Sequence, residues 1–231
     1  MEKLKLINLP KPLLKGKVSL EETIFKRRTH RAFGNSPLTL KEVSQLLFSG
    51  QGITDKGFYR TVPSAGALFP IEAYLVSGNV QGIPQGIYRY RPKTHQLIKV
   101  LSGDKRKELF DATFFQFWIE EAPAAIVLTG IPWKTMIKYG WRGKAFVLME
   151  IGHSAQNISL QTIPLGLGTV CIGGFNKRKV KNILKLKKAE TPLYILPIGR
   201  VSKNSRKKEM QALERQKQAM REFFSSKKLQ S

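Results

Sequence analysis

The sequence predicts an α+β sandwich of sheet and helices. Its expected strands and helices do not follow the regular strand–helix–strand rhythm that a doubly wound parallel sheet requires. Residues 86–90 and 96–101 are typical of a hairpin, because the turn-rich sequence RPKTH separates two strand-like runs. The helix expected over 144–162 is apolar on most sides, which favours burial all round. A chain of 231 residues, 42% of them hydrophobic, is long enough for one packed domain of this kind.

The chain begins with a basic arm followed by two capped helices. Residues 1–18 are expected to be extended, and their prolines interrupt any hydrophobic segment of export length, so we expect no signal peptide. Ser19 and Glu22 have the spacing of a capping box at the start of a short helix. Thr39 and Glu42 repeat that spacing ahead of a second helix.

The remaining elements are read from short apolar runs and helical periodicity. Strands are expected over 73–76, 124–130, 166–175 and 192–201. Helices are expected over 104–121, 177–188 and 205–224. The last helix carries only a sparse apolar stripe, so we expect it to pack on another surface.

Charge and cysteine content narrow the functional classes. Forty Lys and Arg against sixteen Asp and Glu give a net charge of +24, which attracts nucleic acid, anionic membranes or a phosphorylated cofactor. The single cysteine, Cys171, excludes an intrachain disulfide and a cysteine-rich metal site and suits the reducing cytoplasm. Its apolar neighbours predict a small core residue, with a reactive thiol as the alternative. The longest apolar stretch, 122–133, is too short to span a membrane.

Three stretches could carry chemistry. The sequence PSAGA, at 63–67, leaves the backbone nearly bare, either for a flat ligand or for a tight loop before a strand. The sequence KRRTHR, at 26–31, offers three guanidinium groups and a hydroxyl as a phosphate clamp, or else a solvated basic face. In GHSAQN, we expect His153 and Asn157 to be satisfied by neighbouring protein groups, with ligand contact as the alternative for them and for Gln156.

The chain resembles the flavin-dependent nitroreductase superfamily, and within it the SagB-type azoline dehydrogenases and their stand-alone relatives. The resemblance lies in seven stretches that occur in the same order and at about the same spacing: RRTHRAF, PSAGALFPIEAYLV, GIYRYRP, KYGWRG, MEIGHSAQNISLQ, GLGTVCIGGF and PLYILPIGR. It covers residues 19–201 and leaves out the arm at 1–18 and a basic helical tail at 202–231. It implies a nitroreductase-like sandwich with a mainly antiparallel sheet flanked by helices. It also implies an intertwined homodimer with one flavin mononucleotide (FMN) at each of two interface sites, and NAD(P)H as a candidate electron donor.

The same resemblance assigns the cofactor residues. Arg27 and Thr29 would face the phosphate and ribityl chain, with Arg28 alongside. Arg31 would lie toward the pyrimidine end of the ring, where its charge would stabilise the reduced flavin. Arg200 would complete the phosphate clamp. The ring would rest on the backbone of Pro63, Ser64, Ala65, Gly66 and Ala67, with its other side approached by Ile172, Gly173 and Gly174.

Lys138 and Tyr139 match a Lys-Tyr dipeptide that is associated, in azoline dehydrogenases, with removal of a proton from the ring being oxidised. The alternative is a surface lysine beside a packing tyrosine. Relatives usually carry an aromatic residue and an arginine where this chain has Lys144, Ala145 and Phe146. Because of this difference, the resemblance does not identify the substrate. The resemblance therefore implies an FMN-dependent oxidoreductase, reducing an electrophile or oxidising a small heterocycle. The alternative from another class is a basic nucleic-acid-binding protein without redox activity, and non-specific polyanion binding beside a redox role also stays open.

Overall fold

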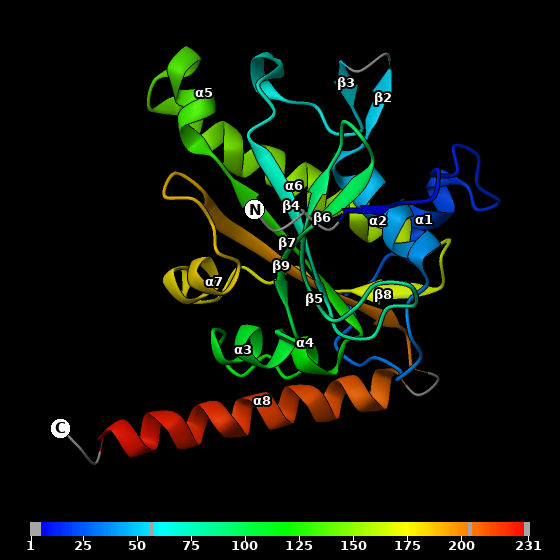
Figure 1. Cartoon of the computed structure of the whole chain (residues 1–231). Helices are drawn as coiled ribbons and strands as arrows, with labels where there is room; N and C mark the ends of the chain where they lie inside the picture. Colours follow the sequence, from blue (N-terminus) through cyan, green and yellow to red (C-terminus); the bar gives the residue numbers. More distant parts are fainter. Residues whose placement is uncertain (1–5, 56–57, 203–204, 229–231) are drawn as a thin grey trace.

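The computed structural model describes residues 6–55, 58–202 and 205–228. It confirms the α+β class: helices flank a sheet whose paired strands are all antiparallel (Figure 1). The sheet has seven strands in the order β1-β6-β5-β4-β7-β9-β8. Their bounds are β1 Leu6–Asn8, β4 Ile71–Ser77, β5 Gly86–Arg91, β6 Gln96–Ser102, β7 Ala124–Gly130, β8 Leu167–Thr169 and β9 Thr191–Arg200. A separate pair, β2 Ile53–Asp55 and β3 Tyr59–Arg60, forms a small ribbon.

The strand β7 is an inner strand of the sheet, between β4 and β9. All seven of its residues are buried, and the residues from Ala124 to Leu128 alternate between two hydrophobic clusters on the two faces of the sheet. Burial on both faces explains why its sequence, AAIVLTG, shows no polar alternation.

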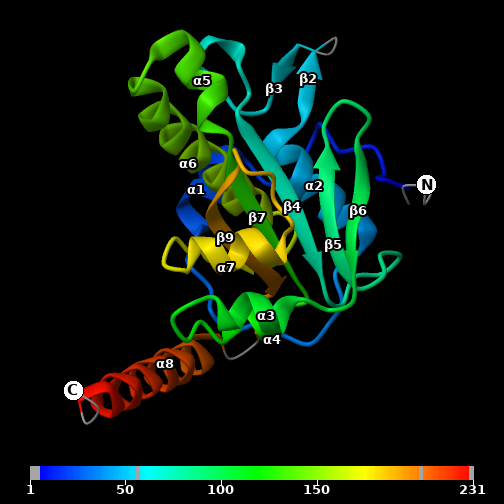
Figure 2. The same cartoon turned by 60° about the vertical axis from the view of Figure 1, so that its left-hand side comes forward.

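Each face of the sheet is covered by its own helices (Figure 2). One cluster contains residues of α2 (Leu40–Gln51) and α6 (Arg142–Thr162), and α1 (Leu20–Lys26) lies against α6. The other contains residues of α3 (Arg106–Asp111), α4 (Trp118–Glu121) and α7 (Lys177–Ile183). α5 (Pro132–Tyr139) packs on the start of α6. In the part of the chain that the structure describes, no helix is long and apolar enough to cross a bilayer.

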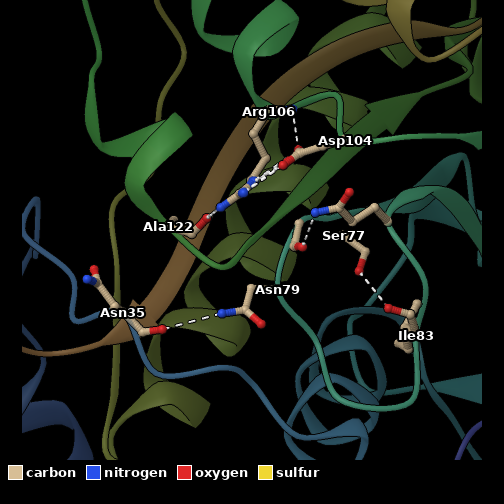
Figure 3. Close-up of polar contacts among 9 residues, drawn as sticks. Asn35, Ser77, Asn79, Ile83, Asp104, Arg106 and Ala122 are labelled. Carbon is tan, nitrogen blue, oxygen red and sulfur yellow. Dashed lines mark hydrogen bonds and ion pairs between the residues drawn. The ribbon is translucent and has the colours of Figure 1, made fainter.

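Polar contacts connect neighbouring loops at the C-terminal end of β4, near Ser77 (Figure 3). The Arg106 guanidinium pairs with Asp104 at 2.6 Å and donates to the Ala122 carbonyl at 2.7 Å. It packs over Gly78, where a Cβ atom would collide with it. This turn therefore needs a glycine for lack of space.

Four expectations from the sequence are wrong in detail. The helix expected over 104–121 is divided into α3 and α4, because Phe115 has a positive φ of 54° and Thr113 pairs with Phe175. The helix α5 was not expected; Pro132 lies in its first turn, where a missing N–H costs nothing. The strand expected over 166–175 is limited to β8, followed by a single bridge between Ile172 and Ile195. The basic helix expected over 177–188 ends at Ile183.

Two burial predictions are also wrong. Cys171 is exposed, because it points away from the interior while its neighbours Val170 and Ile172 are buried. α6 is buried along one side only, since Leu148 and Met149 are each 59% exposed. The long helix thus presents an apolar face to the outside of the chain.

The tail forms the helix α8 (Ser205–Lys228), which runs along the base of the molecule beneath α3 and α4 (Figure 1). The Arg215 guanidinium lies 3.8 Å from the Phe117 ring centroid and pairs with Glu121 at 3.2 Å. Nearer its start, Glu209 contacts the His30 ring at 2.9 Å. The helix predicted over 205–224 is confirmed, and the surface on which it packs belongs to this chain. Residues 1–5 of the predicted arm and residues 203–204 and 229–231 of the predicted tail lie outside the described residues.

The capping box of α2 allows a direct test of local stability. Thr39 Oγ1 accepts from the Glu42 N–H at 3.3 Å, and Glu42 Oε2 accepts from the Thr39 N–H at 2.8 Å. We expect Thr39→Ala to lower the free energy of unfolding by about 1 kcal/mol, measured by urea denaturation. Thr39→Ser keeps the hydroxyl and should stay close to the wild type. An alanine variant as stable as the serine variant would show that the cap contributes nothing.

Candidate functional site

The segment Pro63–Phe69, called here the small-residue loop, has a strained backbone. Ala65–Ala67 form one 3-10 turn, and Gly66, Ala67 and Phe69 have φ values of 62°, 54° and 45°. The left-handed region costs a non-glycine residue roughly 1–2 kcal/mol. Two hydrogen bonds within the loop offset part of this cost: Ala67 N–H donates to the Ser64 carbonyl at 3.0 Å, and Phe69 N–H donates to Ser64 Oγ at 2.9 Å.

A carboxylate from α6 holds the same loop from behind. Glu150 is 4% exposed, and its Oε1 accepts from the Ala65 N–H at 2.8 Å. Burial raises the pKa of Glu150, while the bond from Ala65, the Ser64 hydroxyl and the charges of His153 and Arg60 lower that pKa.

Lys138 and Tyr139 lie directly over Gly66. A Cβ atom placed on Gly66 would be 2.9 Å from Tyr139 Oη and 3.0 Å from Lys138 Nζ, and the φ of 62° strains any residue that has a side chain, so the position favours glycine. The Tyr139 ring is held by an edge contact with Phe146 at 5.1 Å. The structure therefore brings the predicted Lys-Tyr pair and the predicted small-residue loop together; we call this group the loop half-site.

The residues Arg27–Arg31, called here the arginine segment, lie at another place. His30 N–H donates to the Thr169 carbonyl at 3.0 Å, and Gly34 N–H donates to the Arg200 carbonyl at 2.9 Å. The segment therefore runs beside β8 and the end of β9. Its neighbours Ile172, Gly173 and Gly174 follow β8, where Ile172 pairs with Ile195 and Gly173 approaches the Tyr194 ring.

The individual side chains of this group are partly engaged within the chain. Arg28 is exposed, and its Nη1 donates to the carbonyls of Phe25 and Arg27 at 2.8 Å. The Arg31 guanidinium lies 5.6 Å from the Trp118 ring centroid. Arg200 pairs with Glu42 at 2.6 Å and donates to the Leu165 carbonyl at 3.1 Å. Because Glu42 balances its charge, Arg200 is a weaker candidate for a phosphate ligand than the sequence suggested.

The pairing of the strands shows how far the loop half-site lies from Arg200, which is predicted to bind the phosphate. β4 and β9 both pair with β7, and Ile71, Gly130 and Thr191 are level with one another. The small-residue loop precedes Ile71, whereas Arg200 lies nine residues beyond Thr191. At about 3.3 Å per residue, the two ends are about 30 Å apart along the strands. One chain therefore carries two half-sites, at opposite ends of its sheet (Figure 1).

The cavities of the described chain lie elsewhere. One, of about 240 Å³, is lined by Glu72, Arg89, Ile131, Trp133, Lys134, Lys187, Ala189 and Glu190. Another, of about 290 Å³, lies between α8 and the body and is lined by Ala32, Phe33, Glu121, Lys208, Gln211, Ala212 and Arg215. None of the predicted site residues lines either of these two cavities.

The polar residues of α6 have different roles from those expected. Asn157 Nδ2 donates to the Thr61 carbonyl at 2.9 Å, which confirms the structural interpretation of that residue. His153 and Gln156 are exposed, so the assumption that they are buried is wrong. Sequence reasoning missed Glu150, although it is the only acidic residue over 142–162 and that isolation was the available signal.

The comparisons with known proteins identify the family of the chain. The Nitroreductase family profile matches residues 24–200, well over half of the chain. A nitroreductase-like protein of Methanocaldococcus jannaschii is 41% identical over 183 residues, covering 79% of this chain and 91% of that protein. The microcin B17-processing protein McbC of Escherichia coli is 29% identical over 182 residues, 71% of this chain and 63% of McbC.

A solved structure shows the same architecture. A nitroreductase-like protein of Ralstonia eutropha superposes with a TM-score of 0.76 at 28% identity, covering 86% of this chain and 90% of that one. The profile match includes β4 to β9 and all of the predicted site residues. The chain therefore belongs to the nitroreductase family, and it is an oxidoreductase of that family.

Proposed function

We propose that the protein is an FMN-dependent oxidoreductase whose two active sites form between two copies of the chain. The observation that carries this proposal is the separation of the two half-sites. An FMN molecule, with its ring and phosphate joined by a five-carbon chain, is too short to contact both ends of one sheet. A twofold pairing that sets the loop half-site of one copy against the arginine segment of the other would complete two equal sites.

The residues present suit FMN. At the loop half-site, Gly66 is exposed and has no side chain, so its backbone is accessible to a flat ring on the side that Lys138 and Tyr139 leave open. At the other half-site, Arg27, Arg28, Thr29 and Arg31 would hold the phosphate end, with Arg200 in a supporting position. When bound, FMN would supply a hydride acceptor and donor at N5. The backbone of Ile172, Gly173 and Gly174 would then contact the ring from its other side.

The outer face of α6 supports the dimer. Leu148 and Met149 are exposed on it, and Ile137 and Trp141 of the preceding segment are each 76% exposed. Such a cluster is unfavourable in water and marks a contact surface. α6 has 21 residues and is therefore about 30 Å long, so its face reaches from one half-site toward the other.

Lys138 and Tyr139 are proposed to contact the substrate. Their position over Gly66 is suitable for contact with a small heterocycle lying on the ring, and the similarity to McbC favours heterocycle oxidation over reduction of an electrophile with NAD(P)H. In that direction Lys138 would act as the base that takes the proton from the heterocycle, and FMN, when bound, would supply the hydride acceptor. The nucleic-acid alternative has no support beyond the net charge.

The phosphate assignment is tested by cofactor affinity. We expect the purified wild type to bind one FMN per chain and Arg27→Ala to raise the Kd about tenfold or more, because a charge-assisted hydrogen bond contributes about 1.5–3 kcal/mol. Fluorescence titration with FMN measures this. Arg91→Ala, at the exposed end of β5, is the charge-matched control. Equal affinities in both variants would remove Arg27 from the site.

The interface is tested by placing a charge on α6. We expect Leu148→Glu to convert a dimer into a monomer and to abolish FMN binding, because a charge buried without a partner is strongly unfavourable. Sedimentation and FMN content measure the two effects. Leu14→Glu, at a position that is 82% exposed, is the control and should remain a flavin-bound dimer. A monomeric wild type that holds FMN would contradict the two-chain site.

The role of the Lys-Tyr pair is tested by comparing two reactions. We expect Lys138→Ala to retain FMN and to slow oxidation of a thiazoline peptide by about 10²-fold or more, the usual contribution of a base. Quinone reduction by NAD(P)H, which needs no such base, should be nearly unchanged. Lys93→Ala, at an exposed lysine in the turn between β5 and β6, is the control. If both reactions slow equally, Lys138 positions the cofactor instead.

A further inference from the structure

Glu150 lies where a carboxylate is unfavourable unless it has a specific partner. α6 buries it to 4% exposure beside Val147 and Ile151, which belong to the hydrophobic core. Burial of a charged group costs free energy that hydrogen bonds must offset. The Ala65 N–H, 2.8 Å from Glu150 Oε1, is such a donor. It joins residues 85 positions apart, so the carboxylate ties the loop to the helix.

The small-residue loop requires an external restraint. The bonds from Ala67 and Phe69 to Ser64 stay within the loop, and they bend a backbone in which two non-glycine residues are left-handed. A loop held only by internal bonds could relax to a less strained shape. The bond to Glu150 fixes its place relative to α6, and thereby relative to Lys138 and Tyr139, which α5 holds against the same helix.

This bond also decides which amide faces outward. Ala65 N–H is used by Glu150, and Ala67 N–H is used by the Ser64 carbonyl. Of the three amides in the turn, the Gly66 N–H is the one that no described protein group accepts. Gly66 is exposed and lies under Lys138 and Tyr139.

We propose that Glu150 is a positioning residue, whose carboxylate fixes the small-residue loop so that the Gly66 N–H faces the flavin. The identity of the flavin rests on the proposed function; the tie between Glu150 and the loop does not. The carboxylate also places negative charge behind the loop. Because reduction adds negative charge to the flavin, Glu150 opposes reduction and lowers the midpoint potential.

Two variants separate the hydrogen bond from the charge. Glu150→Gln keeps an oxygen that can accept from Ala65, whereas Glu150→Ala removes the acceptor. In the FMN-free protein, we expect hydrogen exchange of the peptide 60–70 to accelerate about tenfold or more in Glu150→Ala and to stay close to the wild-type rate in Glu150→Gln. Glu120→Gln, an exposed acid on α4, is the charge-matched control and should exchange as the wild type does.

The second measurement uses FMN-loaded protein at pH 8, because burial raises the pKa of Glu150 and a higher pH favours its ionised form. We expect Glu150→Ala to raise the Kd for FMN about tenfold. Glu150→Gln should keep the wild-type Kd and have a higher midpoint potential, while Glu120→Gln changes neither. If Glu150→Ala does not fold, the midpoint potential of Glu150→Gln still tests whether the charge of Glu150 acts on the flavin.

Equal exchange in all variants would overturn the tie to the loop, and a Glu150→Gln potential equal to that of the wild type would overturn the effect of its charge. A wild type that binds no FMN would overturn the proposed function and the flavin part of this proposal. The exchange measurement would still decide whether Glu150 holds the loop.

Discussion

The antiparallel pairing of β7 with β4 on one side and β9 on the other fixes the position of every functional segment in this chain. Because β4 and β9 both oppose β7, they run in the same direction, and their starts are level. The small-residue loop leads into one start, and Arg200 ends the other strand. A shift of one residue in either pairing would turn the buried side chains of β7 toward the wrong face. The hydrophobic core thus maintains the distance between the half-sites.

α6 connects this core to the surface that the dimer would use. Its inner side contributes Val147, Ile151 and Ile158 to the core, and its outer side exposes Leu148 and Met149. The same helix supplies Glu150 to the loop. Packing, loop geometry and the proposed association therefore depend on a single 21-residue element, and a change at one of its faces is expected to affect the others.

Local features of the chain could be predicted from the sequence, and long-range ones could not. The capping box of Thr39 and Glu42 depends on residues three apart, and the structure contains it. The hairpin β5–β6 depends on a short turn and is also present. By contrast, the bond from Ala65 to Glu150 joins positions that only the folded sheet brings together, so neither the partner nor the role of Glu150 could be read from its neighbours. The exposure of Cys171 depends on its place in the irregular segment after β8, which its apolar neighbours conceal.

The helix α8 follows the region that the family profile matches, which ends at residue 200. Through Glu209 it nevertheless contacts His30, in the middle of the arginine segment. A segment outside the shared domain is thus attached to the part of the chain that would bind phosphate. Substitutions in α8 could therefore change the affinity for the cofactor without changing any residue within the region that the family profile matches.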